Sequence, residues 1–269
     1  MHELIFLGTG CPNGSKQRGE ASIFFDGLLL DCGNECADKL VSLNLINNIN
    51  SILITHLHSD HIGDIGRLLS IIALNSTRLK TINLFSPPGF SKIVDKYTNI
   101  SEILSYFSEK IHIELHEGLI KNKYIGGKII SSYEMNHNVE DYGYLIEFDG
   151  TKLFYTGDTR KCAIPIKVDY VIHDSMSTES EKGIVDDTGH STAKDAALFA
   201  RDVDAKVLFL THINNDWISN NTELIDEAKM HFNGEIYIAE DFARFSLKSK
   251  SELHSSLRSD MNSIKKDRV

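Results

Sequence analysis

The chain has 269 residues, of which 41% are hydrophobic and 25% are charged, and its formal net charge is −10 at pH 7. These values are ordinary for a globular protein long enough to bury a substantial core as one domain. No stretch approaches the roughly 20 consecutive apolar residues of a membrane span, and residues 1–8 lack the pattern of a secretory signal. The composition predicts a cytoplasmic protein, and the sequence shows no strong Lys/Arg cluster of the kind that usually holds long nucleic acids.

Strand and helix patterns alternate along residues 1–245, which we expect to form one catalytic domain. A first strand begins almost at the N-terminus, and the apolar runs 21–25 and 28–31 flank Asp26-Gly27, a hairpin-turn signal. Helices are predicted over 35–43, 62–75 and 90–107. The later predicted strands are 81–85, 111–115, 128–133, 142–148, 152–155, 170–173, 207–210 and 235–239, with helices over 192–202 and 221–230. Residues 246–269 are predicted to be a C-terminal tail, either a short helix or disordered.

Three histidines and one aspartate lie within six residues, directly after the apolar segment 52–54: His56, His58, Asp60 and His61. A strand that ends just before His56 would place them on a tight loop leading into a helix. Nitrogen and oxygen donors on such a loop can converge on a divalent cation such as Zn²⁺. One loop cannot complete two coordination spheres, so further donors are expected elsewhere. The four cysteines (Cys11, Cys32, Cys36 and Cys162) show no metal or disulfide spacing and are predicted to be free thiols.

The chain resembles the metallo-β-lactamase-fold hydrolases over roughly residues 3–240. Their HxHxDH signature is matched by the four residues above, and three later motifs follow in the family's order: His137 in Met-Asn-His-Asn, Asp158 in Thr-Gly-Asp-Thr and His212 in Leu-Thr-His. The resemblance implies an α/β fold, a four-layer αββα sandwich, with metal loops along one edge. It also implies two Zn²⁺ ions, with Mn²⁺ as an alternative: His56, His58 and His137 on the first, Asp60, His61 and His212 on the second, and Asp158 bridging both.

Within that superfamily the chain is most similar to the ribonuclease Z group of phosphodiesterases. The segments that carry this likeness are Leu7-Gly8-Thr9-Gly10, Gly143-Tyr144-Leu145-Ile146, Ile172-His173-Asp174 and His190-Ser191-Thr192-Ala193. The likeness implies that His190 is the catalytic helper and that Asp174, where the group usually has Glu, orients it. Asp60 would double as a proton acceptor. The alternative for His190 is a surface residue beside a helix N-cap, whereas His173 is expected to be buried with a hydrogen-bonded ring.

The prediction of the substrate rests on a segment that this chain lacks. Ribonuclease Z proteins carry a long arm that grips transfer RNA, but here only a short segment with Asp149-Gly150 separates the strands 142–148 and 152–155. The expected reaction is therefore hydrolysis of a small phosphodiester, by attack of a hydroxide held between the metals. Cyclic nucleotides are the expected substrates, as in similar enzymes that phages use against cyclic-nucleotide (Pycsar) immune signalling. Lys16 and Arg18 either contact a phosphate or lie in a solvated loop.

Three alternatives remain at the level of sequence. A transfer-RNA 3′-processing endoribonuclease would need a basic groove formed in three dimensions or supplied by a partner. A thioester or lactone hydrolase on the same fold would use the same metals. A metal-holding binding module would not turn over any substrate. The resemblance also implies a homodimer.

Overall fold

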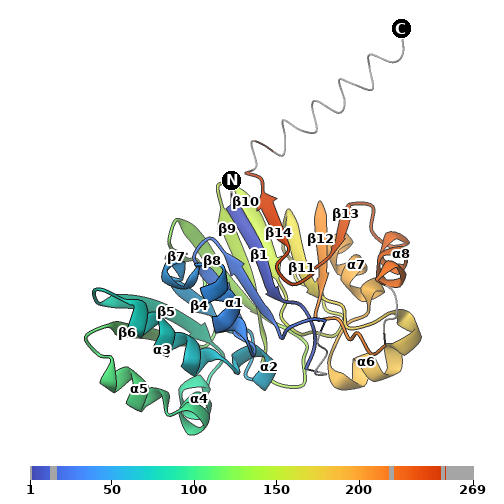
Figure 1. The fold of residues 1–269 in the computed structure, drawn as a ribbon. Helices are drawn as coiled ribbons and strands as arrows, with labels where there is room; N and C mark the ends of the chain where they lie inside the picture. Colours follow the sequence, from blue (N-terminus) through green and yellow to red (C-terminus); the bar gives the residue numbers. More distant parts are fainter. Residues whose placement is uncertain (1, 13–16, 218–220, 250–251, 253–269) are drawn as a thin grey trace.

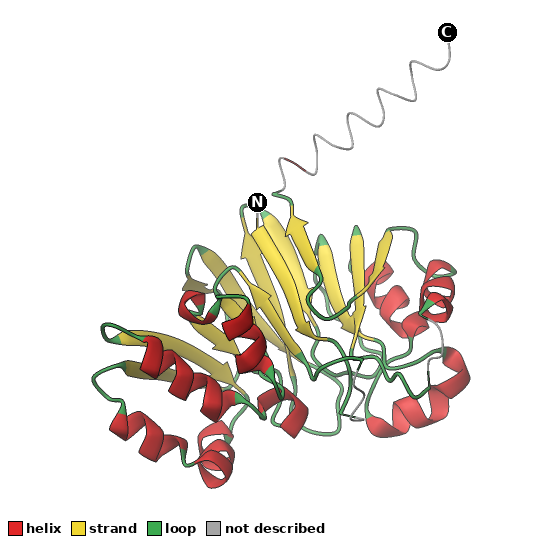
Figure 2. Cartoon of the chain, in the orientation of Figure 1, coloured by secondary structure: helices red, strands yellow, loops and turns green. Residues whose placement is uncertain are grey.

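Two seven-stranded sheets face each other, with helices on both outer sides (Figures 1 and 2). This arrangement is taken from a computed structural model, which describes residues 2–12, 17–217, 221–249 and 252. The first sheet contains, in order, β14 (Arg244–Leu247), β1 (His2–Gly8), β2 (Ser22–Phe25), β3 (Leu28–Leu30), β4 (Ser51–Leu53), β5 (Lys80–Ser86) and β6 (Ile111–Glu117). The second contains β13 (Glu235–Ile238), β12 (Val207–Thr211), β11 (Tyr170–Asp174), β10 (Thr151–Tyr155), β9 (Tyr142–Phe148), β8 (Lys128–Glu134) and β7 (Lys123–Ile125).

Each sheet is antiparallel on one side and parallel on the other. In the first sheet β14, β1, β2 and β3 pair antiparallel, and β3 to β6 pair parallel. In the second, β7 to β10 pair antiparallel, and β10 to β13 pair parallel. Parallel strands bring their carboxyl ends to one edge of a sheet, and ligands bind preferentially in the crevice at that edge.

The side chains of the strands alternate between two environments, which sets the four layers. Leu4 and Phe6 of β1 point into the core between the sheets, whereas Ile5 and Leu7 point toward the helices. The helices α1 (Cys36–Ser42), α3 (Ile65–Asn75), α4 (Phe90–Thr98) and α5 (Ile100–Tyr106) cover the first sheet, while α7 (Ala193–Asp202) and α8 (Thr222–Lys229) cover the second. The expected αββα sandwich is confirmed. Among the described residues, no helix is long and apolar enough to cross a membrane.

The helices of the first half are shorter than predicted. Asn99 adopts a left-handed φ of 49° and ends α4, so the predicted helix 90–107 is two helices. The predicted helix 62–75 is likewise preceded by a separate turn, α2 (Ser59–Ile62), with Gly63 and Asp64 between it and α3. Gly63 packs so closely that a Cβ there would lie 2.7 Å from the Asn34 side chain and the Ser59 carbonyl.

Besides α2, five short elements were not predicted: β7, β14, α6 (Lys182–Thr188) and the 3₁₀ turns η1 (Ile46–Asn48) and η2 (Glu179–Glu181). The strand β14 pairs antiparallel with β1 and includes Ser246 and Leu247, so the sheet extends past the boundary expected at residue 245. Most of the predicted tail lies outside the described residues.

Candidate active site

The candidate residues lie on loops at one edge of the sandwich, and most directly follow a strand. His56 and His58 follow β4, and α2 carries Asp60 and His61. The remaining residues belong to the second sheet's side: His137 follows β8, Asp158 follows β10, Asp174 ends β11, His190 lies between α6 and α7, and His212 follows β12. Both sheets therefore contribute residues to this edge of the sandwich.

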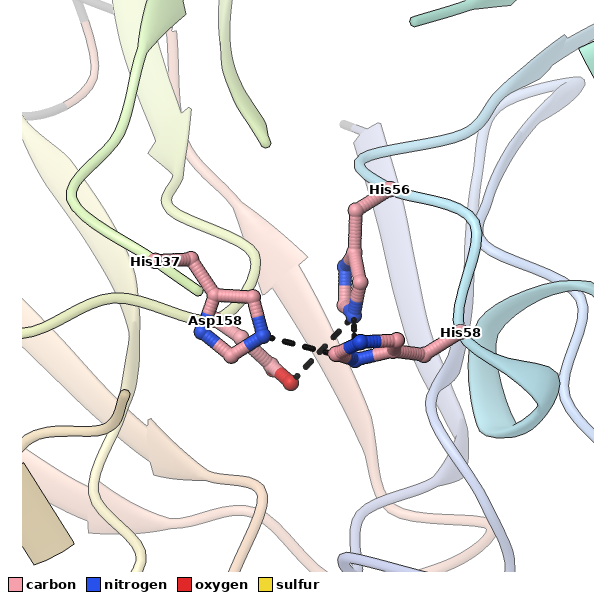
Figure 3. Close-up of side chains that lie close together, drawn as sticks. All are labelled: His56, His58, His137 and Asp158. Atoms are coloured by element: carbon pink, nitrogen blue, oxygen red, sulfur yellow. Dashed lines mark hydrogen bonds and ion pairs between the residues drawn. The ribbon is translucent and has the colours of Figure 1, made fainter. Parts of the chain in front are cut away.

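The first set of donors is His56, His58, His137 and Asp158, whose side chains point toward one another (Figure 3). His56 Nε2 lies 2.9 Å from His58 Nδ1 and 3.6 Å from Asp158 Oδ2. His137 Nε2 lies 3.4 Å from His58 Nδ1. Three imidazole nitrogens and one carboxylate oxygen at this spacing match the donor number and chemistry of a tetrahedral zinc site.

The second set is Asp60, His61, His212 and again Asp158. Asp158 Oδ2 lies 3.3 Å from His61 Nε2 and 3.4 Å from His212 Nε2, and Asp60 Oδ2 lies 3.4 Å from His61 Nε2. The ring atom His61 Nε2 and both ring nitrogens of His212 are buried without a hydrogen-bond partner among the described residues. Because buried polar atoms are rarely left unpaired, these nitrogens fit a cation as their missing partner.

The opposite ring nitrogens of three histidines lie close to oxygen atoms outside the two sets. His56 Nδ1 lies 2.8 Å from Asp141 Oδ2, and His61 Nδ1 lies 2.8 Å from Asp31 Oδ2. His137 Nδ1 lies 2.8 Å from the Gly189 carbonyl oxygen. Such contacts fix the tautomer and the ring orientation, which leaves Nε2 free to bind a metal.

Burial and neighbouring charges shift the pKa values of several site residues. Burial lowers the pKa of His56 well below its ordinary value and also lowers the pKa values of His58 and His137, which favours the neutral, metal-binding imidazole. Burial opposes charge on Asp158, but the neighbouring rings of His212 and His61 hold its pKa well below the usual range. Asp158 is therefore a carboxylate, the form required of a ligand shared by two cations.

His190 lies beside these sets and is held by Asp174. Its Nδ1 is 2.9 Å from Asp174 Oδ2 and 3.9 Å from Asp158 Oδ2. Burial alone would lower the pKa of His190, but the Asp174 and Asp158 carboxylates raise it to about 9. The shorter Asp174 thus reaches the ring although the similar enzymes usually have Glu, and the reading of His190 as an ordinary surface residue is wrong, since it is 7% exposed.

The sequence also gave expectations for two basic residues, for His173 and for the four cysteines. Arg18 is buried and donates to Thr9 Oγ1 at 2.8 Å, to the Ala239 carbonyl and to Asn215 Oδ1 at 3.1 Å, so it does not lie in a solvated loop. Lys16 lies outside the described residues. His173 is fully buried with Nδ1 2.6 Å from the Asp174 carbonyl oxygen, as expected. The four cysteines are free thiols, which also agrees with the prediction.

Two anchoring carboxylates, Asp31 and Asp141, were missed in the sequence. Asp31 Oδ2 also accepts a hydrogen bond from the Tyr155 hydroxyl at 2.7 Å, and the Thr55 backbone donates to Oδ1 at 2.8 Å. Asp141 is 1% exposed, and burial raises its pKa well above the ordinary value. Each is an acidic residue adjoining an apolar strand, and this position is the one signal that could have revealed them.

A shared carboxylate, two histidine-rich donor sets and a histidine–aspartate pair at the edge of an αββα sandwich define a metal-dependent hydrolase. The family model described as beta-lactamase superfamily domain matches residues 27–213. The chain belongs to this superfamily and, within it, to its ribonuclease Z-like phosphodiesterases, which act on phosphoester bonds.

Similar proteins agree with this assignment. Ribonuclease Z of Archaeoglobus fulgidus is 28% identical over an alignment that covers 90% of this chain and 96% of the relative. The crystal structure of the short form of human tRNase Z has a TM-score of 0.75 at 24% identity and covers 91% of this chain and 99% of its own. The metallo-beta-lactamase fold protein YhfI of Bacillus subtilis has a TM-score of 0.75 at 20% identity, with 91% and 98% covered.

Proposed function

We propose that the chain is a dinuclear zinc phosphodiesterase that hydrolyses small phosphodiesters, with 3′,5′-cyclic nucleotides as its main substrates and nucleoside monophosphates as products. The observation that carries the proposal is Asp158, whose carboxylate belongs to both donor sets and lies beside the His190–Asp174 pair. Two neighbouring cation sites next to a protonated imidazole suit hydrolysis of a phosphodiester, because the ester oxygen that leaves needs a proton.

The metal roles follow from the two donor sets. His56, His58 and His137 would hold the first cation, Asp60, His61 and His212 the second, and Asp158 both. Two zinc ions there would lower the pKa of water from 15.7 towards about 7 and polarise the phosphoryl oxygens. Mn²⁺ accepts the same nitrogen and oxygen donors.

The chain's own groups would then move the protons. The Asp60 carboxylate, whose pKa is lowered by His61 against the effect of burial, is available to accept a proton from the nucleophile. His190 would donate its proton to the departing ester oxygen, while Asp174 holds the ring through Nδ1. The catalytic residues are therefore Asp60 and His190, and Asp174 is a positioning residue.

Support for a small substrate comes from the place where the similar enzymes carry an arm. Strands β9 and β10 are joined by Asp149 and Gly150 alone, with φ values of 43° and 74°, which is a tight hairpin turn. The alignment with the A. fulgidus enzyme spans 305 positions, whereas this chain has 269 residues, so that relative carries segments that this chain lacks. The net charge of −10 also disfavours a long polyanion.

A transfer-RNA 3′-processing endoribonuclease is the second candidate. It is favoured by the ribonuclease Z relatives, which align over most of this chain. It would require the RNA to be bound by surfaces other than an arm between β9 and β10.

The first proposal also includes a homodimer and a cytoplasmic location. Light scattering after size-exclusion chromatography tests the dimer.

The test is a turnover panel on the zinc-loaded full chain, with and without chelator. It contains 3′,5′-cyclic purine and pyrimidine nucleotides, cyclic dinucleotides, precursor transfer RNA, bis(p-nitrophenyl) phosphate and a thioester. We expect chelator-sensitive hydrolysis of cyclic nucleotides that is lost in Asp60→Ala and kept in the exposed control Asp202→Ala. Preferential cleavage of precursor transfer RNA would establish the second candidate. Activity on the thioester alone, or no turnover at all with tight zinc binding, would overturn both.

A further inference from the structure

A small apolar cavity adjoins the first donor set. Its volume is about 250 Å³, and His58 forms part of its wall. The other walls come from three separate loops at the same edge of the sandwich: Leu57 after β4, Pro87 and Pro88 after β5 with Ile93 of α4, and Val139 after β8. Leu57 and Ile93 also pack against the core beneath the first sheet, so the walls are fixed by the fold.

One charged group lies at this cavity, the carboxylate of Glu140. The buried Tyr142 hydroxyl donates a hydrogen bond to Glu140 Oε1, which orients the carboxylate. Among the described residues, Oε2 has no hydrogen-bond donor. The cavity thus presents apolar walls and one fixed acceptor.

Resting on the proposed function, we infer that this cavity binds the nucleobase of the substrate and that Glu140 selects bases with an amino group. A phosphodiester held beside His58 brings the rest of its own molecule to the adjoining cavity. In a cyclic nucleotide the only large part beyond the phosphate and ribose is the base. Ligand pockets usually measure about 300–1,000 Å³, so this slightly smaller cavity suits one ring system and excludes a polynucleotide.

The chemistry of the walls matches a base. Its faces are apolar and pack against proline and aliphatic side chains, while its polar atoms lie on its edge. A carboxylate accepts hydrogen bonds from the exocyclic amino groups of adenine and cytosine, and it repels a carbonyl oxygen at that position. Adenine and cytosine nucleotides should therefore bind better than analogues without the amino group.

The test measures binding, so it does not depend on turnover. Isothermal titration calorimetry on the zinc-loaded full chain compares 5′-AMP, purine riboside 5′-monophosphate, which lacks only the amino group, and ribose 5-phosphate. We expect AMP to bind about 5- to 20-fold more tightly than the purine riboside compound, since one hydrogen bond to a charged acceptor is worth that factor at a partly exposed site. The purine riboside compound should in turn bind more tightly than ribose 5-phosphate.

Variants assign the effect to the cavity. In Glu140→Gln the Tyr142 hydroxyl would hold the amide oxygen, so the amide NH₂ would face the base and the preference for AMP should disappear. Glu235→Gln is the matched control, because Glu235 Oε2 accepts from the Tyr237 hydroxyl at 2.6 Å in the same i, i+2 relation on β13. Val139→Asp, on the 42% exposed rim, should bring AMP affinity down to that of ribose 5-phosphate.

Each outcome separates this inference from the proposed function. Equal affinities for AMP, the purine riboside compound and ribose 5-phosphate would overturn the nucleobase cavity, even if cyclic nucleotides are hydrolysed. A preference for AMP that persists in Glu140→Gln would also overturn the role of Glu140. An AMP preference lost in Glu140→Gln and kept in Glu235→Gln supports the inference, and it would stand even if no phosphodiester were hydrolysed, which would refute the proposed function alone.

Discussion

Replacement of Asp174 by Asn tests the role proposed for His190. Asp174 Oδ2 lies 2.9 Å from His190 Nδ1, and it also accepts hydrogen bonds from the backbone N–H groups of Thr159 at 3.1 Å and Ser191 at 3.3 Å. The amide oxygen of Asn can keep accepting from the backbone, but it carries no charge. The substitution therefore removes the carboxylate from the imidazole and leaves the local backbone supported.

The size of the effect follows from the pKa of His190. Among the charges that oppose the burial of this ring, Asp174 contributes most to raising its pKa from an ordinary 6.5 to about 9. At about 1.4 kcal/mol for each pKa unit, this rise corresponds to roughly 3 kcal/mol in favour of the protonated ring. Without Asp174 the pKa of His190 would return toward the ordinary 6.5, at which only a few per cent of the rings are protonated at pH 8, against roughly nine-tenths in the native protein. We expect kcat at pH 8 to fall roughly 30-fold.

The assay separates proton donation from a general loss of structure. A general acid works in its protonated form, so native activity should decline only as pH rises through about 9. In Asp174→Asn the decline should begin below about pH 7. The defect should be large for 3′,5′-cyclic nucleotides, which expel an alkoxide, and small for bis(p-nitrophenyl) phosphate, whose p-nitrophenolate needs little protonation.

Two controls complete this experiment. Asp174→Glu should retain activity on both substrates because it restores a carboxylate. Asp169→Asn removes a carboxylate that accepts from the Lys152 backbone and from Lys206 Nζ outside the site, and it should leave the pH profile unchanged. An equal loss on both substrates in Asp174→Asn, or an unshifted alkaline limb, would refute the assignment of His190 as proton donor.

Three further predictions follow from the packing around the site. Chelation should lower the melting temperature and zinc should restore it, since a ligand at 1,000 times its Kd stabilises the folded state by about 4 kcal/mol; an unchanged melting curve would argue against bound metal. Asp31→Ala should weaken zinc binding about 10- to 100-fold in a competition titration with a chromophoric chelator, because it frees the His61 ring. Asp195, in the α7 capping box and 2.5 Å from Lys182 Nζ, has a lowered pKa in the folded state. The stability that it adds relative to Asp195→Asn should therefore be full at neutral pH and disappear as pH falls below about 4, and a difference in unfolding free energy that does not vary with pH would contradict this.

The structure brings together the seven residues that the sequence motifs single out, because those motifs are either contiguous or follow the family's order along the chain. His56, His58, Asp60 and His61 form one contiguous motif, and the later donors each follow an apolar strand. Strand ends on parallel strands meet at one edge of a sheet, so a correct strand prediction carries the donor positions with it. The structure brings all seven together: β4, β10 and β12 each have a parallel partner, whereas His137 follows β8, which pairs antiparallel with β7 and β9.

Interactions between distant segments carry no such signal. Asp31 and Asp141 anchor His61 and His56, yet each reads in the sequence as an ordinary acidic residue at a strand end. The strand β14 forms by pairing with the edge of β1, which lies near the other end of the sequence. The prediction for Arg18 rested on its charge alone. Its burial follows from a loop that folds back against residues 239–241, far away in the sequence.

The difference between local signals and contacts of distant segments also explains why the proposed substrate preference could be argued only from the structure. The absence of an arm can be read from Asp149-Gly150, since a two-residue turn is local. The apolar cavity cannot, because its walls come from three loops that follow β4, β5 and β8, and the last belongs to the opposite sheet. The metal donors suit any phosphodiester, so the residues that choose among substrates must lie outside them. Glu140, three residues after His137 and oriented by Tyr142, is placed to make that choice.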